Sequence, residues 1–432
     1  MIARIESDPA DSGRARLPPR LLATMIGLGF ASGLPLFLTN RVLQQWLSES
    51  GLSLAAIGAV GVIGLPYVLK FLWAPLFDRA PPPPFRVLGR RRGWLLLAQL
   101  GVSLSIAAIA CADPRRDAVW LVDAAVALAF FSASQDIAID AWRIESFAPS
   151  RQTAALGLYV WGYRIALVLA LSGTIWLAVA NPLGWHGAYA AMALLSLSGP
   201  ALCLSLPEPH APAHVNERLV DALRRSVAVP FADLLRRPAA VLVLAFVATF
   251  NLGTQFADTL AIPLYHRLGY GHDQVAAAIG VPNLIAALAG AALAGVLVRA
   301  LGLGRALVGC TLVQMASLCV YFVLLGRPPS GGLLIAKTVI EELAESTAQT
   351  VFLSYLSLLC AREFAATQYA LLSALSALGW RTLAGSSGAI AAAIGMHEFY
   401  LFALACCLPS IALMMYLLSR FPAGVPPRIS GG

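Results

Sequence analysis

The sequence predicts an all-α membrane protein with about twelve transmembrane helices. Hydrophobic residues make up 59% of the 432 residues and charged residues only 12%, against roughly 25% charged residues in a typical soluble domain. The mean hydropathy is +0.76. Polar side chains are therefore too few to cover a water-soluble particle of this size, and we expect lipid to contact most of its surface.

Segments long enough to cross a hydrocarbon core, roughly 20 residues each, fall into two groups of six. The first group lies near 21–47, 54–77, 93–112, 119–145, 153–180 and 186–206. The second group lies near 239–266, 273–298, 304–325, 332–360, 365–394 and 397–420. We expect a tail at 1–20, a six-helix bundle at 21–206, a linker at 207–238, a second bundle at 239–420 and a tail at 421–432.

The distribution of basic residues predicts that both termini and the linker are cytoplasmic. The linker begins with prolines, which oppose a helix there, and continues with arginines. With cytoplasmic termini, most of the 30 Lys and Arg residues fall on the cytoplasmic side, and the exceptions in external loops are Arg115, Arg116, Arg267 and Arg327. This asymmetry follows the positive-inside rule, and we expect a bacterial inner-membrane protein.

The two groups of spans also resemble repeats of one unit. The fifth span, at 153–180, carries Gly162-Tyr163-Arg164. The eleventh span, at 365–394, carries Gly379-Trp380-Arg381. Two six-span repeats in parallel orientation are typical of major-facilitator transporters, whose solute site lies between the halves at mid-membrane. We therefore expect a major facilitator fold of two six-helix bundles.

Ionisable residues within the spans are the candidates for function, because each costs roughly 2.5–3.5 kcal/mol at a helix centre. Such residues face the bundle interior and belong to ion pairs, solute sites or proton paths. The basic ones are Arg41, Lys70, Arg164, Lys337 and Arg381. The acidic ones are Asp136, Asp140, Asp258, Glu341, Glu342 and Glu345.

In the span at 332–360, Lys337, Glu341 and Glu345 follow one another at steps of four and share a helical face. Lys337 is placed to neutralise Glu341, which leaves Glu345 without a local partner. Burial favours the protonated form of a carboxyl group, which suits a proton carrier. The alternative is that all three form structural ion pairs with neighbouring spans.

In the span at 119–145, Asp136, Asp140 and Arg143 share a face at i, i+4 and i+7. We expect Asp136 to take part in transport directly. Asp140 and Arg143 lie near the cytoplasmic end, where a gating role and simple anchoring of the loop both fit. The loop between the second and third spans contains Asp78, Arg79 and the run from Arg90 to Arg92. We expect this charged cluster to latch the halves in one state.

Arg164 and Arg381 lie near the middle of their spans and correspond in the repeat. Planar guanidinium forks suit carboxylates and phosphates, so an anionic solute is favoured over a hydrophobic drug. The alternative is that each arginine pairs with a buried acid and never contacts solute.

Other classes of protein find little support. The seven cysteines lie in apolar runs without metal-ligand spacing, and the scattered basic residues do not indicate nucleic-acid binding. Gly331 to Thr338 lacks the second glycine of a phosphate-binding loop and follows no strand. We expect no cofactor, no metal and no enzymatic activity, and a monomer in the lipid bilayer.

Several strings resemble a known family. They are Gly29-Phe-Ala-Ser-Gly-Leu-Pro-Leu36, Lys70-Phe-Leu-Trp-Ala-Pro-Leu-Phe-Asp-Arg79, Arg91-Arg-Gly-Trp-Leu-Leu96, Ser132-Ala-Ser-Gln-Asp-Ile137, Asp140-Ala-Trp-Arg143 and Ala366-Thr-Gln-Tyr-Ala-Leu-Leu-Ser-Ala-Leu-Ser-Ala377. With these strings the chain resembles the muropeptide permease (AmpG) family of the major facilitator superfamily over nearly its whole length.

The resemblance implies import of anhydro-muropeptides, which are GlcNAc-anhydroMurNAc peptides, from periplasm to cytoplasm. It also implies dependence on the proton gradient and a place in cell-wall recycling and β-lactamase induction. By motif, the family roles carry over to Lys70, Asp78, Arg79, Gln135, Asp136, Asp140 and Arg164.

Two positions depart from the family. Asn251-Leu252-Gly253-Thr254 stands where the family often has Lys-Leu-Gly-Asp, with Asp258 one turn later, and Arg41 stands where a small residue is expected. A siderophore or other anion importer of a related family is the rival interpretation, and a membrane enzyme acting on lipid-linked sugars is a second.

These observations lead to three groups of site residues. We assign substrate binding to Arg164, Arg381, Arg41 and Gln135. We assign proton coupling to Asp136, Glu345, Glu341 and Asp258. We assign gating to Lys70, Asp78, Arg79, Asp140, Arg143 and Lys337.

Overall fold

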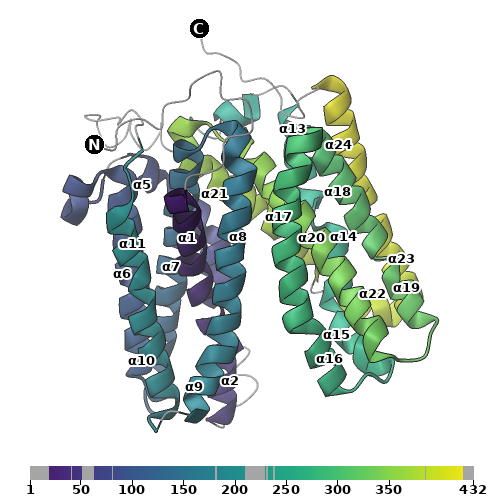
Figure 1. Ribbon diagram of the computed structural model, residues 1–432, viewed down its shortest axis with the longest axis horizontal. Coiled ribbons are helices and arrows are strands. Elements are labelled where there is room, and N and C mark those ends of the chain that lie inside the picture. The colour runs from purple at the N-terminus through teal and green to yellow at the C-terminus, as the bar shows by residue number, and fades with distance from the viewer. Residues whose placement is uncertain are drawn as a thin grey trace.

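The structure is a computed structural model. It describes residues 19–39, 41–50, 63–79, 81–180, 182–209, 229, 232–236, 239–384 and 386–421. Within these ranges the side chains of Arg79 and Arg381 lie outside the described part. Every regular element in the described ranges is a helix, and Figure 1 shows them gathered in two bundles that stand side by side.

The N-terminal half contains the helices up to Ser205. They are α1 (Pro19–Leu38), α2 (Arg41–Glu49), α4 (Leu65–Leu69), η2 (Lys70–Leu72), α5 (Ala74–Arg79), η3 (Pro83–Leu88), α6 (Arg90–Ala110), α7 (Ala118–Ser146), η4 (Pro149–Arg151), α8 (Gln152–Val168), η5 (Leu169–Gly173), α9 (Thr174–Ala180), α10 (Gly184–Ser196) and α11 (Ser198–Ser205). Short breaks divide several membrane spans, as at η5, a single π-helical turn between α8 and α9.

The C-terminal half begins at Ala240. Its helices are α13 (Ala240–Thr249), α14 (Leu252–Thr259), α15 (Ala261–Arg267), α16 (His272–Ile279), α17 (Val281–Leu301), α18 (Leu303–Ser317), α19 (Val320–Leu325), α20 (Gly331–Leu359), η6 (Arg362–Phe364), α21 (Ala365–Ala384), α22 (Ser387–Ile394), α23 (Met396–Ala405) and α24 (Leu408–Arg420).

In the described part of the chain, nine helical segments are long and apolar enough to cross a membrane. Three more helical segments complete two sets of six: residues 63–79, α20 and α21 with α22. The first of these is only partly described, and α20 is too rich in charged and polar residues to meet a hydropathy criterion. Ionisable groups occur in α20 and also in spans that meet this criterion, such as α7 and α8.

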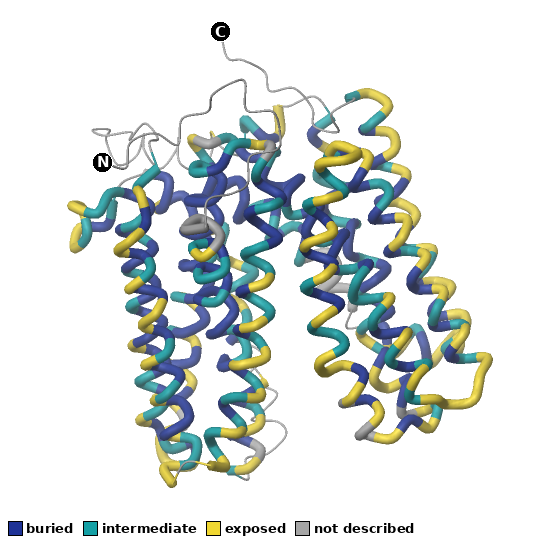
Figure 2. The backbone as a smooth tube through the Cα atoms, in the orientation of Figure 1, coloured by how far each residue is buried: buried dark blue, intermediate teal, exposed yellow. Residues whose placement is uncertain are grey.

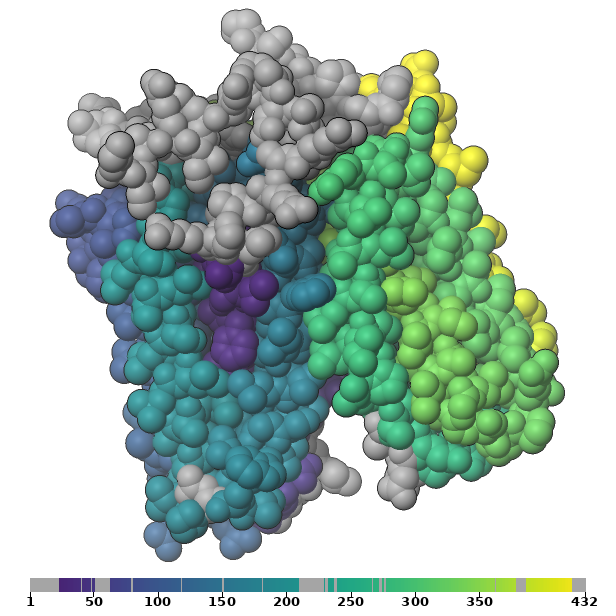
Figure 3. All heavy atoms as spheres, in the orientation of Figure 1, coloured from purple at the N-terminus to yellow at the C-terminus, as the bar shows by residue number. Residues whose placement is uncertain are grey.

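In the described residues, contact between the halves runs from one end of the molecule to mid-span. We call the end at which α7 and α20 finish, at Ser146 and Leu359, the linker end, and the opposite end the far end. One hydrophobic cluster runs across both halves at the linker end and joins Trp142 to Phe352 and Tyr355. Each half has a separate cluster of its own toward the far end, where Figure 3 shows a notch between the halves.

Exposed residues lie along the outer sides of both bundles (Figure 2). Large apolar side chains are among them, for example Trp176, Leu194, Val241 and Met415. In water such a surface would cause aggregation, whereas in a bilayer it meets acyl chains. The arrangement therefore describes a multi-pass membrane protein.

Two glycines bring α1 and α8 into backbone contact. A Cβ atom at Gly162 of α8 would overlap the carbonyl oxygen of Ile26, and one at Gly29 of α1 would overlap that of Tyr159. Small residues at helix crossings permit this close approach in membranes. The contact fixes the rotation of α8 and with it the direction of Arg164, two residues after Gly162.

We expect Gly162→Ala to destabilise the protein, because the added methyl group meets backbone that cannot move aside as a side chain would. Overpacking of this kind costs about 1–3 kcal/mol, which thermal unfolding in detergent would measure as a lower midpoint. Gly309→Ala in α18 is the matched control, because its Cβ would meet nothing within 4 Å. The control should be neutral or stabilising by about 1 kcal/mol through helix propensity. Equal effects of the two substitutions would contradict the argument.

Candidate functional site

One face of α8 forms the seam between the halves. Along it, Ala154 faces Gly295, Gly157 approaches the carbonyl oxygen of Ala291, and Trp161 donates to the carbonyl oxygen of Leu288 at 2.8 Å. These positions recur at helical spacing and all face α17. Arg164 comes one turn after Trp161 toward the far end, so it lies where the seam gives way to the space between the halves.

Arg164 pairs with Glu342 of α20 across the two halves. Its Nη2 lies 2.8 Å from Glu342 Oε1, and the side chains are 31% and 12% exposed. Asn283 of α17 donates to the other carboxylate oxygen at 3.1 Å. The pairing with a buried acid that we weighed as the alternative for Arg164 is therefore what the structure contains, and its partner comes from the span at 332–360 as expected.

A second charged group lies inside the C-terminal half. Lys337 contacts Glu341 one turn along α20 and donates to the hydroxyl of Tyr265 at 2.7 Å. Its ammonium group lies 3.9 Å from the centre of the Tyr321 ring. The hydroxyl of Tyr321 in turn reaches Asp258 of α14 at 3.5 Å. Lys337 and Glu341 thus neutralise one another, as the spacing predicts.

Glu345 has a partner that the spacing does not reveal. Gln255 of α14 donates to its Oε1 at 3.4 Å. The spacing along α20 indicates no partner for Glu345 on its own helix, and the partner that the structure gives it comes from another helix and is neutral. An amide donor does not neutralise the carboxylate. The charges around Glu345 are those of Glu341 and Glu342, which repel it, and of Arg164 and Lys337, which attract it.

Asp136 belongs to a hydrogen-bonded chain in the N-terminal half. Ser32 of α1 donates to Asp136 Oδ1 at 2.5 Å, and the hydroxyl of Tyr159 on α8 donates to Ser32 at 2.6 Å. Lys70 of η2 attracts the carboxylate electrostatically. The chain links three spans and ends on the seam helix, so it connects Asp136 to the region that carries Arg164.

Two of the expected substrate-binding residues lie elsewhere. Gln135 is buried and donates to the carbonyl oxygen of Ala31 at 2.8 Å, at the contact between α1 and α7. Arg41 is exposed at the start of α2, with its guanidinium 5.0 Å from the centre of the Phe37 ring. The side chains of Arg79 and Arg381 fall outside the described residues.

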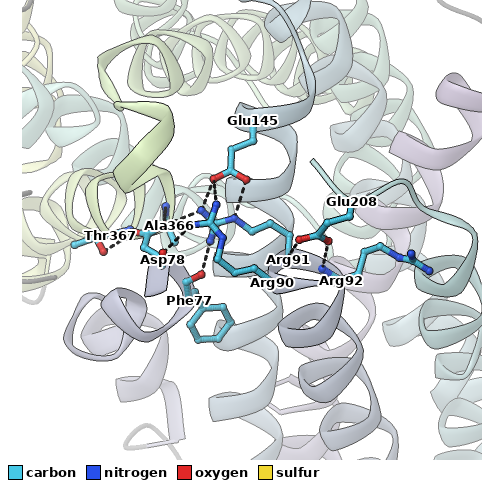
Figure 4. Close-up of polar contacts among 9 residues, drawn as sticks. All are labelled: Phe77, Asp78, Arg90, Arg91, Arg92, Glu145, Glu208, Ala366 and Thr367. Atoms are coloured by element: carbon cyan, nitrogen blue, oxygen red, sulfur yellow. Dashed lines mark hydrogen bonds and ion pairs between the residues drawn. The ribbon is translucent and has the colours of Figure 1, made fainter. Parts of the chain in front are cut away.

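Asp78 fastens the halves at the linker end (Figure 4). In the C-terminal half, its carboxylate accepts hydrogen bonds from the backbone N–H groups of Ala366 and Thr367 at 3.1 and 2.8 Å. The Thr367 hydroxyl adds a bond of 2.7 Å. These groups belong to the first turn of α21, where free N–H groups and the helix dipole favour an anion.

Arg91 connects Asp78 to the rest of the N-terminal half. Its Nη2 lies 2.7 Å from Asp78 Oδ1 and 2.5 Å from Glu145 Oε1. Arg90 also reaches Glu145, at 2.9 Å. Glu208 accepts from the backbone N–H groups of Arg91 and Arg92 at 2.7 and 3.0 Å, which caps α6 (Figure 4). We call Asp78, Arg91, Glu145 and Thr367 the latch.

Arg143 forms a second contact between the halves at the linker end. Its guanidinium donates to Gln152 at 2.8 Å, to the hydroxyl of Ser357 on α20 at 2.9 Å and to Asp140 at 3.1 Å. It also lies 5.4 Å from the centre of the Tyr369 ring. Asp140 and Arg143 therefore occur together at the closed end, where gating residues are expected.

The sequence argument missed partners that come from distant segments. Glu342 is recognisable as a membrane acid but lies off the face of Lys337, Glu341 and Glu345, so its spacing indicated no role. Glu145 and Thr367 fall at helix ends and read as ordinary polar residues. Only the packing of α5, α6, α7 and α21 shows that they meet Asp78 and Arg91.

The arrangement offers charged groups that can bind an anion and exchange a proton. Arg164 comes from the N-terminal half, and the carboxylate of Glu342 lies beside it in the C-terminal half. Among the residues that the structure describes, no group of three or more His, Cys, Asp or Glu is arranged to hold a metal ion. Two bundles with ionisable groups at mid-span and contact at one end define a membrane transporter.

Comparisons with known proteins agree with this class. The family model of the Major Facilitator Superfamily matches residues 21–380. The chain is similar in structure to a Major Facilitator Superfamily transporter, FucP, in the outward conformation, with a TM-score of 0.68, 14% identity and coverage of 91% of this chain and 98% of that one. It is also similar to a bacterial homologue of the iron transporter ferroportin in the outward-facing state, with a TM-score of 0.68, 14% identity and coverage of 94% and 100%.

Two relatives identify the family within the superfamily. The anhydromuropeptide permease of Escherichia coli K12 is 37% identical over 397 residues, which cover 91% of this chain and 79% of that protein. A protein named putative transporter AmpG 4 of Rickettsia felis is 31% identical over 391 residues, covering 90% and 94%. The chain belongs to the muropeptide permease (AmpG) family of the major facilitator superfamily. It is a permease and not an enzyme.

We expect Asp78→Asn to open the linker end. The substitution removes the negative charge of a side chain that is only 5% exposed. Arg91 and the N–H groups in the first turn of α21 then lose their anionic partner. Breaking such a buried pair costs about 3–5 kcal/mol. Distances between spin labels on the two halves at this end would shift toward longer values. Asp113→Asn is the control, because Asp113 and Arg116 form a pair 3.8 Å apart that is 43% and 87% exposed and contributes little. An unchanged distance distribution in Asp78→Asn would rule out the latch.

Proposed function

We propose that the protein imports anhydro-muropeptides across a bacterial inner membrane by proton-coupled alternating access. The observation that carries the proposal is the Arg164–Glu342 pair, which joins the halves at mid-span and leaves the Arg164 side chain 31% exposed. A guanidinium fork at this depth suits the carboxylates of a peptide. The identity to the E. coli permease over 91% of the chain supports the substrate class.

The distribution of charge supports an orientation for the two ends. Arginines gather at the linker end, with Arg90, Arg91 and Arg92 at the start of α6, and the positive-inside rule then makes this end cytoplasmic. Both termini and the linker at 207–238 are cytoplasmic in this proposal, and the bundles are 21–206 and 239–420. Contact at the linker end and a gap at the far end then correspond to the outward-facing state, ready to receive solute from the periplasm.

Each group of residues has a role in this cycle. Arg164, with Arg381 as its counterpart in the repeat, holds the carboxylates of the substrate. Asp136 and Glu345 take up the proton, because each carboxylate accepts a hydrogen bond from a neutral side chain, Ser32 and Gln255 respectively. Asp78 with Arg91, and Arg143 with Asp140, keep the cytoplasmic end closed until the loaded carrier reorients. The carrier acts as a monomer with the proton gradient as its driving force.

We expect membrane vesicles that contain the protein to accumulate labelled anhydro-muropeptide without covalent change. An ionophore that collapses the pH gradient should stop accumulation while equilibration continues, because only uphill movement needs the gradient. A labelled ferric siderophore, tested in parallel, should not enter. Uptake of the siderophore in place of the muropeptide would transfer the proposal to the rival substrate, and accumulation without a gradient would exclude proton coupling.

We expect Glu345→Gln to abolish uphill uptake and to preserve counterflow exchange. The amide keeps the shape and the contact with Gln255 but cannot take up a proton, so substrate still crosses only in exchange for substrate. Glu398→Gln is a suitable control, since this carboxylate is 59% exposed in α23 and far from the cluster. Full accumulation by Glu345→Gln would assign the proton to another acid.

A further inference from the structure

Glu342 occupies the position that a substrate carboxylate would need. Its Oε1 lies 2.8 Å from Arg164 Nη2, so the guanidinium fork already has a carboxylate partner in this structure. That carboxylate comes from the opposite half. Arg164 therefore has an ion-pair partner that ties the halves together. Because the Arg164 side chain is partly exposed, it can also meet a second carboxylate from solution.

The pair is close but poorly aligned. Although the two atoms are at ion-pair distance, Glu342 Oε1 accepts no hydrogen bond. Its other oxygen is fixed by Asn283 on α17, a helix of the same half. Glu342 is thus held firmly on the C-terminal side and loosely on the Arg164 side. Arg164 is also the more exposed partner, at 31%, so solvent and solute reach it first.

We propose that Glu342 is a built-in competitor for the substrate carboxylate and so sets both affinity and selectivity at Arg164. This proposal rests on the function proposed above and adds a residue to it. An arriving carboxylate takes the guanidinium and Glu342 loses its partner from the other half. Binding of an anionic solute then removes the cross-half ion pair, whereas a neutral solute leaves it intact.

This exchange explains why a loaded carrier behaves differently from an empty one. A ligand shifts a conformational equilibrium only by its differential interaction with the two states. A solute that simply filled the space would bind both states alike, but one that displaces Glu342 changes how strongly the halves hold each other. The selection for carboxylates follows from the same step, because an anionic solute keeps the guanidinium of Arg164 paired when Glu342 leaves it. Glu342 then retains its hydrogen bond from Asn283.

The test is direct binding to the purified full-length protein by calorimetry. The two ligands are an anhydro-muropeptide with free carboxylates and the same compound with every carboxylate converted to the carboxamide. We expect Glu342→Gln to tighten binding of the free acid about three- to tenfold, the equivalent of a partly screened ion pair. Binding of the amide form should not change. Equal shifts for both ligands, or weaker binding of the acid, would overturn the proposal.

Two further variants separate competition from general damage. Glu342→Asp keeps the charge but shortens the reach to Arg164, so its effect should be in the same direction and smaller. Glu398→Gln removes an exposed carboxylate elsewhere in the C-terminal half and should leave both ligands unaffected. If Glu398→Gln tightens binding of the free acid as much as Glu342→Gln does, the effect comes from the change of net charge and the competition is excluded.

A second measurement does not depend on the substrate. Arg164 should react several-fold faster with an arginine-selective dicarbonyl reagent in Glu342→Gln than in the parent, as peptide mass spectrometry would record, because the guanidinium has lost its ion pair. An unchanged rate would refute the competition whatever the substrate proves to be. If the parent binds neither muropeptide but the rate rises, the proposed substrate fails and the competitor role of Glu342 stands.

Discussion

The high cost of an unpaired charge away from water governs this structure. In the described spans, the ionisable groups near mid-membrane lie beside other polar groups. Their partners generally come from a different helix. Glu342 meets Arg164 and Asn283, Lys337 meets Glu341 and Tyr265, and Asp136 meets Ser32. Packing of apolar helices gives little discrimination in lipid, because acyl chains are as apolar as the side chains. The polar contacts therefore specify which helices are neighbours and which contacts must break during transport.

The sequence predicted the fold well because lipid imposes simple rules on it. The expected span at 332–360 corresponds to α20 at Gly331–Leu359, and the expected span at 119–145 to α7 at Ala118–Ser146. Length, hydropathy and basic residues near helix ends carry this information locally. The breaks inside spans, such as the π-helical turn before Thr174, depend on packing and were not foreseeable from composition.

The site was predictable only in part. Contacts along one helix followed from spacing, as for Lys337 with Glu341 and for Asp140 with Arg143. Contacts between helices did not follow: Arg164 proved to face Glu342, Glu345 to face Gln255, and Asp78 to face α21. A helical wheel gives the direction of a side chain relative to its own axis, whereas the identity of its partner depends on rotation and depth of a second helix.

The latch has a consequence for the path by which the closed end opens. Asp78 binds groups of both halves: a guanidinium in its own half and the N–H groups of α21 in the other. These groups move apart when the closed end opens. When the halves separate, those N–H groups and the carboxylate each need a replacement partner, and at this end only water is small and mobile enough to provide it. Hydration must therefore accompany the first movement rather than follow it. Reorientation of the carrier becomes a solvation process, and its rate should respond to the activity of water at the membrane surface as well as to the solute.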